Sequence, residues 1–177
     1  MKVLGRLAAT LAVLIIGTFA VLLIWANYRV PPLPTGARAD KILVDKSQRR
    51  LVLLHQGKPL KAYRIALGPT PVGHKECQGD GRTPEGLYRI DFRKPDSAFH
   101  RALHISYPNA RDIQVARSRG VDPGGAIMIH GLGKNLGWFG KLHYFVDWTA
   151  GCMAVTNAEI EELWRAAPDG TPVEIRP

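Results

Sequence analysis

The chain has 177 residues, of which 46% are hydrophobic and 22% are charged. This balance is typical of a globular protein and excludes a disordered chain, and the two cysteines are too few for a disulfide-rich scaffold. The formal net charge is +9, of which +5 lies in residues 40–177, and this favours an anionic polymer or lipid head groups as partner. No basic stripe with interleaved aromatic residues is present, so nucleic-acid binding is not expected.

An uncharged run of 20 residues, Leu7 to Ala26, dominates residues 1–30 and is long enough to cross a bilayer as a helix. Trp25 and Tyr28 lie at its far end, where aromatic side chains favour the membrane interface. Basic residues before the run place the N-terminus in the cytoplasm, although Arg29 after it weakens that asymmetry. The run is longer than the apolar core of a signal peptide, which favours an uncleaved anchor over a cleaved signal segment.

A proline-rich linker, residues 31–39, follows the apolar run and begins with Pro31-Pro32-Leu33-Pro34-Thr35-Gly36. Proline fixes φ and cannot continue a helix, so this stretch forms a stiff connection. One soluble domain is expected over residues 40–177, outside the cytoplasmic membrane.

Short apolar runs bounded by turn residues fill most of the soluble domain and indicate β-strands. The first three, at residues 41–44, 50–55 and 60–67, have spacings that favour an antiparallel meander. Further strands are predicted at residues 87–92, 103–106, 126–129 and 171–175, with an apolar run at 153–155. A glycine- and proline-rich loop spans residues 68–86, and a loop of this length is more often functional than idle.

Helical signals are few. Residues 111–118 are compatible with one short helix. The clearest helix begins after Thr156, whose hydroxyl is placed to cap it, with Glu159 three positions later as the capping-box partner. The predicted fold class is therefore mainly β, with one helix in the C-terminal region and a transmembrane helix in front.

Cys152 and His130 are the candidate reactive residues. Cys152 follows the small-residue turn Thr149-Ala150-Gly151, where a substrate can approach closely and backbone N–H groups can stabilise an oxyanion. His130 ends an apolar run and is followed by Gly131, which leaves that end open. A cysteine nucleophile needs a nearby base, so together they suggest cysteine acyl transfer, although either residue alone is compatible with a buried core position.

Several neighbouring residues leave alternatives open. His143 is a competing base nine residues before Cys152, and Asp147 either orients an imidazole or caps a turn. Trp138 and Phe139 form either a lid or a packed aromatic pair. 

A disulfide between Cys77 and Cys152 would remove the nucleophile, and such bonds are common outside the cytoplasm. A metal site is not expected, because the histidines and cysteines have no recognised ligand spacing.

Four segments together resemble the YkuD-type L,D-transpeptidase family, also known as the ErfK/YbiS/YcfS/YnhG group. They are Asp40-Lys41-Ile42-Leu43-Val44-Asp45-Lys46, Gly79-Asp80-Gly81-Arg82-Thr83-Pro84-Glu85-Gly86-Leu87-Tyr88, Ile129-His130-Gly131 and Thr149-Ala150-Gly151-Cys152. The resemblance covers residues 40–177 and implies a β-rich sandwich, no cofactor, and peptidoglycan as the partner, with a diderm bacterial periplasm as the best-fitting location.

The resemblance also implies roles for individual residues. Cys152 attacks the carbonyl of the third residue of a peptidoglycan tetrapeptide stem, D-alanine leaves, and an amine of a second stem resolves the thioester. His130 is the general base, and the N–H groups of Gly151 and Cys152 form the oxyanion site. Thr149, Ala150 and Gly131 are expected to contact substrate.

Two positions depart from the family pattern. Ala150 stands where a histidine is usual, and Ala154 stands where an arginine is frequent. These departures keep two alternatives open: a peptidoglycan amidase or carboxypeptidase, and a non-catalytic wall-binding module. The acceptor amine and the oligomeric state are not predicted.

Overall fold

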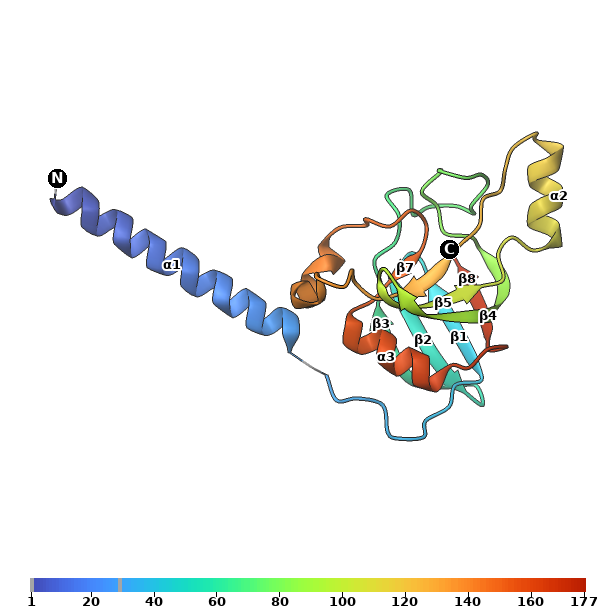
Figure 1. The fold of residues 1–177 in the computed structure, drawn as a ribbon, viewed down its shortest axis with the longest axis horizontal. Coiled ribbons are helices and arrows are strands. Elements are labelled where there is room, and N and C mark those ends of the chain that lie inside the picture. The colour runs from blue at the N-terminus through green and yellow to red at the C-terminus, as the bar shows by residue number, and fades with distance from the viewer. Residues whose placement is uncertain (1, 29) are drawn as a thin grey trace.

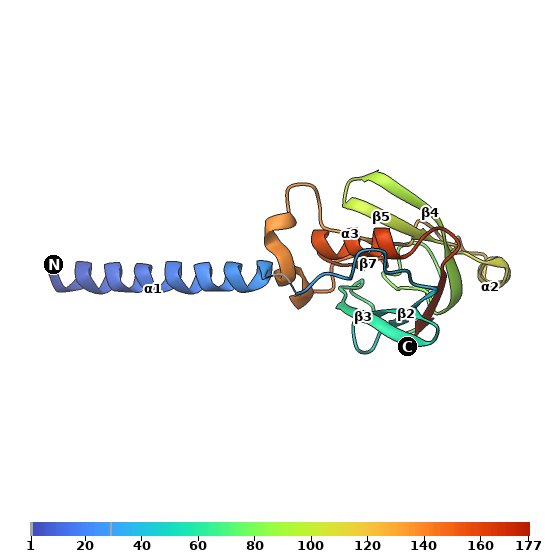
Figure 2. The same cartoon turned by 90° about the horizontal axis from the view of Figure 1, so that it is seen from below.

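The computed structural model describes residues 2–28 and 30–177. Arg29, whose charge weakens the predicted asymmetry around the apolar run, lies outside the described residues. A long helix, α1 (Lys2–Asn27), projects from a β-rich domain (Figure 1). Seen from below, α1 leaves the domain at one end and the short helix α2 (Ala110–Ser118) lies at the opposite end (Figure 2).

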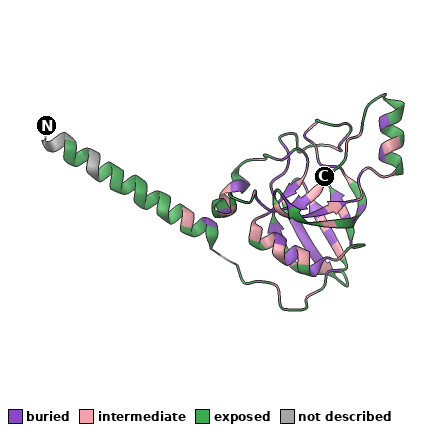
Figure 3. Cartoon of the chain, in the orientation of Figure 1, coloured by how far each residue is buried: buried purple, intermediate pink, exposed green. Residues whose placement is uncertain are grey.

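Helix α1 has the length and composition of a membrane span. Its stretch Gly5–Asn27 has a mean hydropathy of 2.7 over its most apolar window, none of which is buried in the protein. Figure 3 shows α1 exposed along most of its length, whereas buried residues gather in the domain. Among the described residues it is the only helix with this length and hydropathy. A signal sequence near an N-terminus has the same two properties.

Eight strands form one mixed sheet in the order β3-β2-β1-β8-β4-β5-β6-β7. Their bounds are β1 (Lys41–Asp45), β2 (Arg50–His55), β3 (Lys58–Arg64), β4 (Gly86–Ser97), β5 (His100–Ile105), β6 (Met128–His130), β7 (Met153–Ala154) and β8 (Pro172–Arg176). The pairs β1–β8 and β6–β7 are parallel and the other neighbouring pairs are antiparallel. The first three strands form the predicted meander.

The sheet folds into two layers, and strand β4 belongs to both of them. Its first residues pair with β8 and its later residues pair with β5, so the strand is shared by both layers. At the far edges, Ala66 and Ala154 exchange two N–H···O bonds of 2.9 Å, which join the chain after β3 to β7. The mainly β, sandwich-like fold predicted from the sequence is confirmed.

Strand boundaries differ from the predictions where turns are tighter than expected. The β2–β3 turn consists of Gln56 and Gly57 alone, with φ of 51° and 74°, which is the two-residue geometry suited to a hairpin. Strand β3 therefore starts at Lys58 and ends at Arg64, earlier than the predicted 60–67. Strand β4 runs on to Ser97, beyond the predicted end at Phe92.

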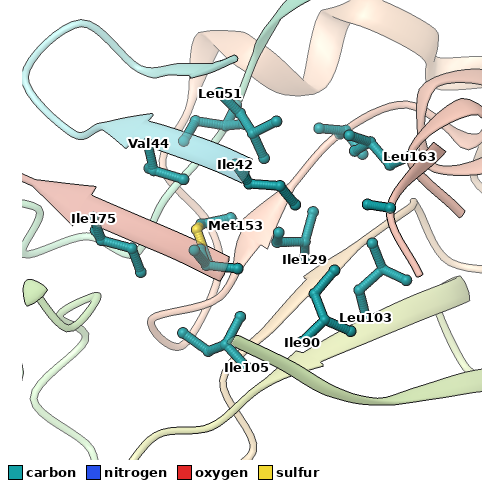
Figure 4. Packing of buried hydrophobic residues seen from close by; sticks show 14 of the residues in the cluster. Ile42, Val44, Leu51, Ile90, Leu103, Ile105, Ile129, Met153, Leu163 and Ile175 are labelled. Carbon is teal, nitrogen blue, oxygen red and sulfur yellow. The ribbon is translucent and has the colours of Figure 1, made fainter. Parts of the chain in front are cut away.

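The core lies between the two layers and under helix α3 (Asn157–Ala166). Strand β1 alternates half-buried and buried positions, as the two-residue period of a strand requires. Figure 4 shows the inward side chains meeting side chains of the second layer and of α3. They include Ile42, Val44, Leu51, Ile90, Leu103, Ile105, Ile129, Met153, Leu163 and Ile175.

Helix α3 begins as predicted. The hydroxyl of Thr156 accepts the N–H of Glu159 at 3.3 Å, and the Glu159 carboxylate accepts the N–H of Thr156 at 2.9 Å. This capping box satisfies backbone donors that a helix start leaves free. Helix α2 agrees with the short helix expected at residues 111–118, and a kinked 3₁₀ segment, η1 (Gly137–Phe145), is an additional helical element.

Candidate active site

The parallel pair β6–β7 brings Cys152 and His130 to one face of the sheet. The register pairs Ile129 with Met153 and His130 with Ala154. Ile129 and Met153 point into the core, so by strand alternation His130 and Cys152 both point away from it. From a strand spacing of about 4.8 Å and a rise of about 3.3 Å per residue, their Cα atoms lie roughly 8 Å apart.

The Cys152 thiol is half-buried. Its Sγ–H donates to the carbonyl of Ala126 at 3.5 Å. Burial raises the pKa of the thiol, while the N–H of Met128 and the positive charge of Lys75 act in the opposite direction and offset only part of that rise. The resting group is therefore a protonated thiol, which needs a base to become a nucleophile.

His130 has the protonation state and tautomer that a base requires. Its Nδ1 lies 2.7 Å from the carbonyl of Gly131, and because a carbonyl only accepts, Nδ1 carries the hydrogen. Nε2 therefore has a free lone pair. Burial lowers the pKa of His130, and the bond to Gly131 only partly opposes this, so the imidazole is neutral at pH 7.

Two aromatic side chains hold the His130 ring in place. Phe99 lies against one face with ring centroids 4.5 Å apart, and Trp148 approaches edge-on at 5.7 Å. No sequence pattern predicted either contact, since Phe99 comes from the β4–β5 turn and Trp148 from the loop after η1.

His143, the competing base, lies behind Trp148. The Trp148 Nε1–H points to His143 Nδ1 at 3.4 Å, and the ring is buried against Tyr144 with centroids 3.9 Å apart. Burial lowers the pKa of His143 to about 3, with the nearby His130 and Arg64 as smaller causes. His143 therefore supports Trp148, which in turn contacts the His130 ring.

The turn before Cys152 is fixed by hydrogen bonds from two sides. Thr149 is buried; its hydroxyl donates to the carbonyl of Cys152 at 2.8 Å and accepts the N–H of Gly151 at 3.2 Å. The hydroxyl of Thr83, from the long glycine-rich loop, donates to the carbonyl of Gly151 at 2.8 Å. Ala150 lies exposed at the outer side of the turn.

Gly131 lies in a space where a side chain does not fit. A Cβ added there would lie 2.7 Å from Oδ1 of Asn157 and 3.0 Å from the carbonyl oxygen of Phe99. The Asn157 oxygen also accepts the N–H of Leu132 at 2.7 Å, which ties the segment after His130 to the start of α3. Gly131 is buried, and its carbonyl orients His130.

Gly151→Ala is expected to destabilise the turn and slow modification of Cys152. Gly151 has φ of 110°, and an added Cβ would overlap the carbonyl oxygen of Arg82. We expect a loss of about 3 kcal/mol in the free energy of unfolding. Gly57→Ala is the matched control, because Gly57 also has a positive φ, 74°, but no atom within 4 Å of an added Cβ. Urea unfolding and the rate of thiol alkylation measure both effects, and equal losses in the two variants would contradict the steric argument.

The loop over residues 68–86 contributes a charge that the sequence did not reveal. Lys75 is buried and its ammonium donates to the carbonyl of Cys77 at 2.9 Å and to Asp80 at 2.8 Å. Those bonds hold a positive charge where it favours the Cys152 thiolate. The loop's unusual length was the only signal in the sequence that pointed to such a role.

The alternatives for Asp147 and Cys77 are resolved by their contacts. Asp147 forms an ion pair with Arg49 at 2.8 Å and accepts the N–H of Leu67 at 2.9 Å. It therefore anchors the loop after η1 and does not orient an imidazole. Cys77 and Cys152 are both free thiols. Within residues 2–28 and 30–177, no group of three His, Cys, Asp or Glu side chains is placed to hold a metal ion.

Comparison with known proteins identifies the family. Residues 39–175 match the model of the YkuD family, described as the L,D-transpeptidase catalytic domain. A curated relative, "Putative L,D-transpeptidase YafK" of Escherichia coli (strain K12), is 32% identical over 130 residues. This match covers 70% of the present chain but only 45% of YafK, so the chain spans less than half of that relative.

Solved structures share the fold. The helical cell shape determining protein Pgp2 of Campylobacter jejuni has a TM-score of 0.58 at 23% identity, covering 89% of this chain and 54% of Pgp2. An L,D-transpeptidase from Xylanimonas cellulosilytica has a TM-score of 0.51 at 18% identity, covering 85% of this chain and 66% of the other. With the family match over residues 39–175, these findings show that the chain belongs to the YkuD family of L,D-transpeptidase catalytic domains.

Proposed function

We propose that this protein is a cysteine-dependent L,D-transpeptidase that modifies peptidoglycan stem peptides through a thioester. One observation carries the proposal: His130 ends β6, Cys152 immediately precedes β7, and strand alternation places both side chains on the face opposite the core. The protonated thiol and neutral imidazole there are complementary, because one gives the proton that the other accepts.

The reaction proceeds in two half-reactions. Nε2 of His130 takes the proton from Cys152 Sγ as the sulfur attacks the carbonyl of the third stem residue. The bond to D-alanine breaks, its amine receives the proton from His130, and the acyl group stays on sulfur. An acceptor amine then attacks the thioester and the carbon–sulfur bond breaks. His130 takes the proton of the amine and returns it to the sulfur, which restores the thiol.

Backbone N–H groups beside the sulfur are suited to the oxyanion. Among the described residues the N–H of Cys152 has no hydrogen-bond acceptor, which makes it the first donor. The N–H of Gly151 is the second donor and exchanges its 3.2 Å bond to the Thr149 hydroxyl for the oxyanion. Thr149 and Ala150 border the substrate on this side, and Gly131 borders it on the histidine side.

The same proposal covers the organisation of the chain. Residues 1–30 form a single-pass anchor, residues 31–39 a linker, and residues 40–177 a catalytic domain outside the cytoplasmic membrane, in the periplasm. It is supported by the exposed apolar length of α1 and by the family's L,D-transpeptidase domain over residues 39–175.

Hydrolysis is the second candidate, since the two alanines affect the choice of acceptor. Ala154 is fully buried and paired with Ala66 and His130, so the arginine frequent in the family has no space at this position. Ala150 offers no polar side chain at the exposed side of the turn. A site with fewer groups to bind an acceptor stem leaves water better able to resolve the thioester.

Digestion of purified peptidoglycan sacculi separates the candidates. We expect new 3→3 cross-linked dimers, identified by chromatography and mass spectrometry of the released muropeptides. Shortened stems, or protein released from the wall, without such dimers would replace transfer by hydrolysis. Unchanged sacculi, with no covalent adduct after incubation with a carbapenem, would identify a wall-binding module without activity.

A further inference from the structure

An aromatic surface on η1 has no role in the proposed chemistry. It consists of Trp138, Phe139 and Phe145, whose exposed fractions are 53%, 40% and 67%. The surrounding residues 131–146 contain two lysines and no acidic residue. Three large exposed aromatic side chains on one short segment mark a surface with a partner.

The segment that carries this surface is packed against the end of α1. The Asn27 side-chain amide donates to the carbonyl of Trp138 at 2.9 Å. The ring of Phe145 lies 6.3 Å from that of Trp25. Gly140, with φ of 49°, touches Ala26 so closely that an added Cβ would overlap the Ala26 carbonyl oxygen. Figures 1 and 2 both show η1 beside the last turn of α1.

The contacts fix the depth of the aromatic surface relative to the apolar helix. The uncharged run of α1 ends at Ala26, and a span of 20 residues is about 30 Å long, the thickness of a bilayer's hydrocarbon core. Trp25 therefore lies at the outer boundary of that core, and Phe145 lies at the same level. Lys141, also in η1, donates to the carbonyl of Tyr28, just after α1, at 2.7 Å.

We propose that the η1 aromatic surface inserts into the outer interfacial layer of the membrane that α1 spans. The inference rests on the proposed anchor and adds a second attachment to it. Tryptophan and phenylalanine rings beside a lysine are suited to this layer, where the rings contact acyl chains and the ammonium contacts phosphate. The partner is the lipid bilayer itself.

This attachment orients the catalytic domain. The chain leaves η1 at Phe145 and reaches Trp148, which contacts His130, and then Cys152. Trp148, which lines the candidate site, is thus only three residues from the end of the membrane-facing segment η1. This connection holds the Cys152 thiol at a constant height above the bilayer. A helix followed only by a free linker would let the domain rotate.

Nitroxide accessibility in vesicles tests the proposal. The full chain, with Cys77 and Cys152 replaced by serine, is placed in phosphatidylethanolamine–phosphatidylglycerol vesicles with one label at Phe139→Cys, Val121→Cys or Val13→Cys. Phe139 and Val121 are both 40% exposed, and Val121 follows α2 at the far end of the domain, so it is the matched control. Val13, 69% exposed in α1, reports on the anchor.

For each label, the measured quantity is the ratio of its accessibility to oxygen to its accessibility to a water-soluble nickel chelate. We expect this ratio to be at least about 3-fold higher at position 139 than at position 121, because oxygen concentrates in the bilayer and the chelate is excluded from it. A water-like ratio at 139 with a lipid-like ratio at 13 would overturn the second attachment and leave the anchor intact. A water-like ratio at 13 would overturn the anchor. Spin–spin broadening at 139 with exclusion of both reagents would identify a second copy of the chain as the occupant.

Discussion

Cys152→Ala is expected to lower the rate of stem-peptide transfer at least about 10³-fold, since removal of a covalent nucleophile leaves only binding and oxyanion stabilisation. The same variant should form no carbapenem adduct, because the acyl group has no sulfur to bond. Muropeptide analysis measures the rate, and intact-mass spectrometry measures the adduct. The fold should be retained, since the hydrogen bond that the thiol donates is a long one, 3.5 Å to the Ala126 carbonyl.

Cys77→Ala is the matched control for this experiment. Cys77 is also a free, half-buried thiol, but its backbone rather than its sulfur contacts Lys75 and Asp80. The control should keep wild-type activity and the adduct. An adduct that persists in Cys152→Ala, or disappears in Cys77→Ala, would assign the chemistry to the other cysteine.

His130→Gln is expected to lower the rate about 10²- to 10⁴-fold at pH 7, the usual effect of removing a general base. Burial raises the pKa of the Cys152 thiol, so without His130 few sulfurs are ionised at neutral pH. The variant should regain activity as the pH rises and the thiolate forms unaided. The wild-type protein should be active at neutral pH without a rise in pH. The ratio of the wild-type rate to the His130→Gln rate should therefore decrease at high pH.

The acid side of the wild-type profile follows from the histidine. A base must be unprotonated, so activity falls as the pH drops through the pKa of His130. Burial lowers that pKa from its usual value of 6.5, and the decline should therefore begin below pH 6.5. Measurement of kcat/KM across pH locates the inflection. A wild-type inflection above pH 6.5 would contradict a buried, neutral base.

His143→Gln separates the two candidate bases. His143 is buried behind Trp148 and is already neutral, with a pKa of about 3. Its replacement should change the rate at pH 7 only a few-fold, through the position of Trp148. An acid inflection that moves in this variant and not in His130→Gln would transfer the role of base to His143.

In the proposed mechanism, the two alanines near Cys152 concern the second half-reaction rather than the first. Neither Ala150 nor Ala154 takes part in the proposed proton transfer between Cys152 and His130. The Ala154 side chain is fully buried, so this position leaves no room for the long charged side chain of an arginine. In the proposed mechanism, the polar groups that bind the acceptor therefore come from other segments.

The sequence by itself determined the local features of this protein. Alternating apolar residues define β1, the pair Thr156 and Glu159 starts α3, and the uncharged run from Leu7 defines α1. Each depends on interactions between residues close in the chain, such as side-chain alternation and helix capping, which a sequence pattern displays directly. The glycine turn before Cys152 was also visible for this reason.

Only the tertiary structure decided what surrounds the candidate pair, Cys152 and His130. The parallel pairing of β6 with β7 sets His130 beside Cys152 across 22 residues, and Phe99, Trp148 and Lys75 reach the site from separate loops. Burial, which sets the pKa of both reactive groups, depends on all of these segments at once. The contact of η1 with α1 joins residues more than 100 positions apart. Such contacts leave no period or motif in the sequence, because they follow from how complete elements pack against one another.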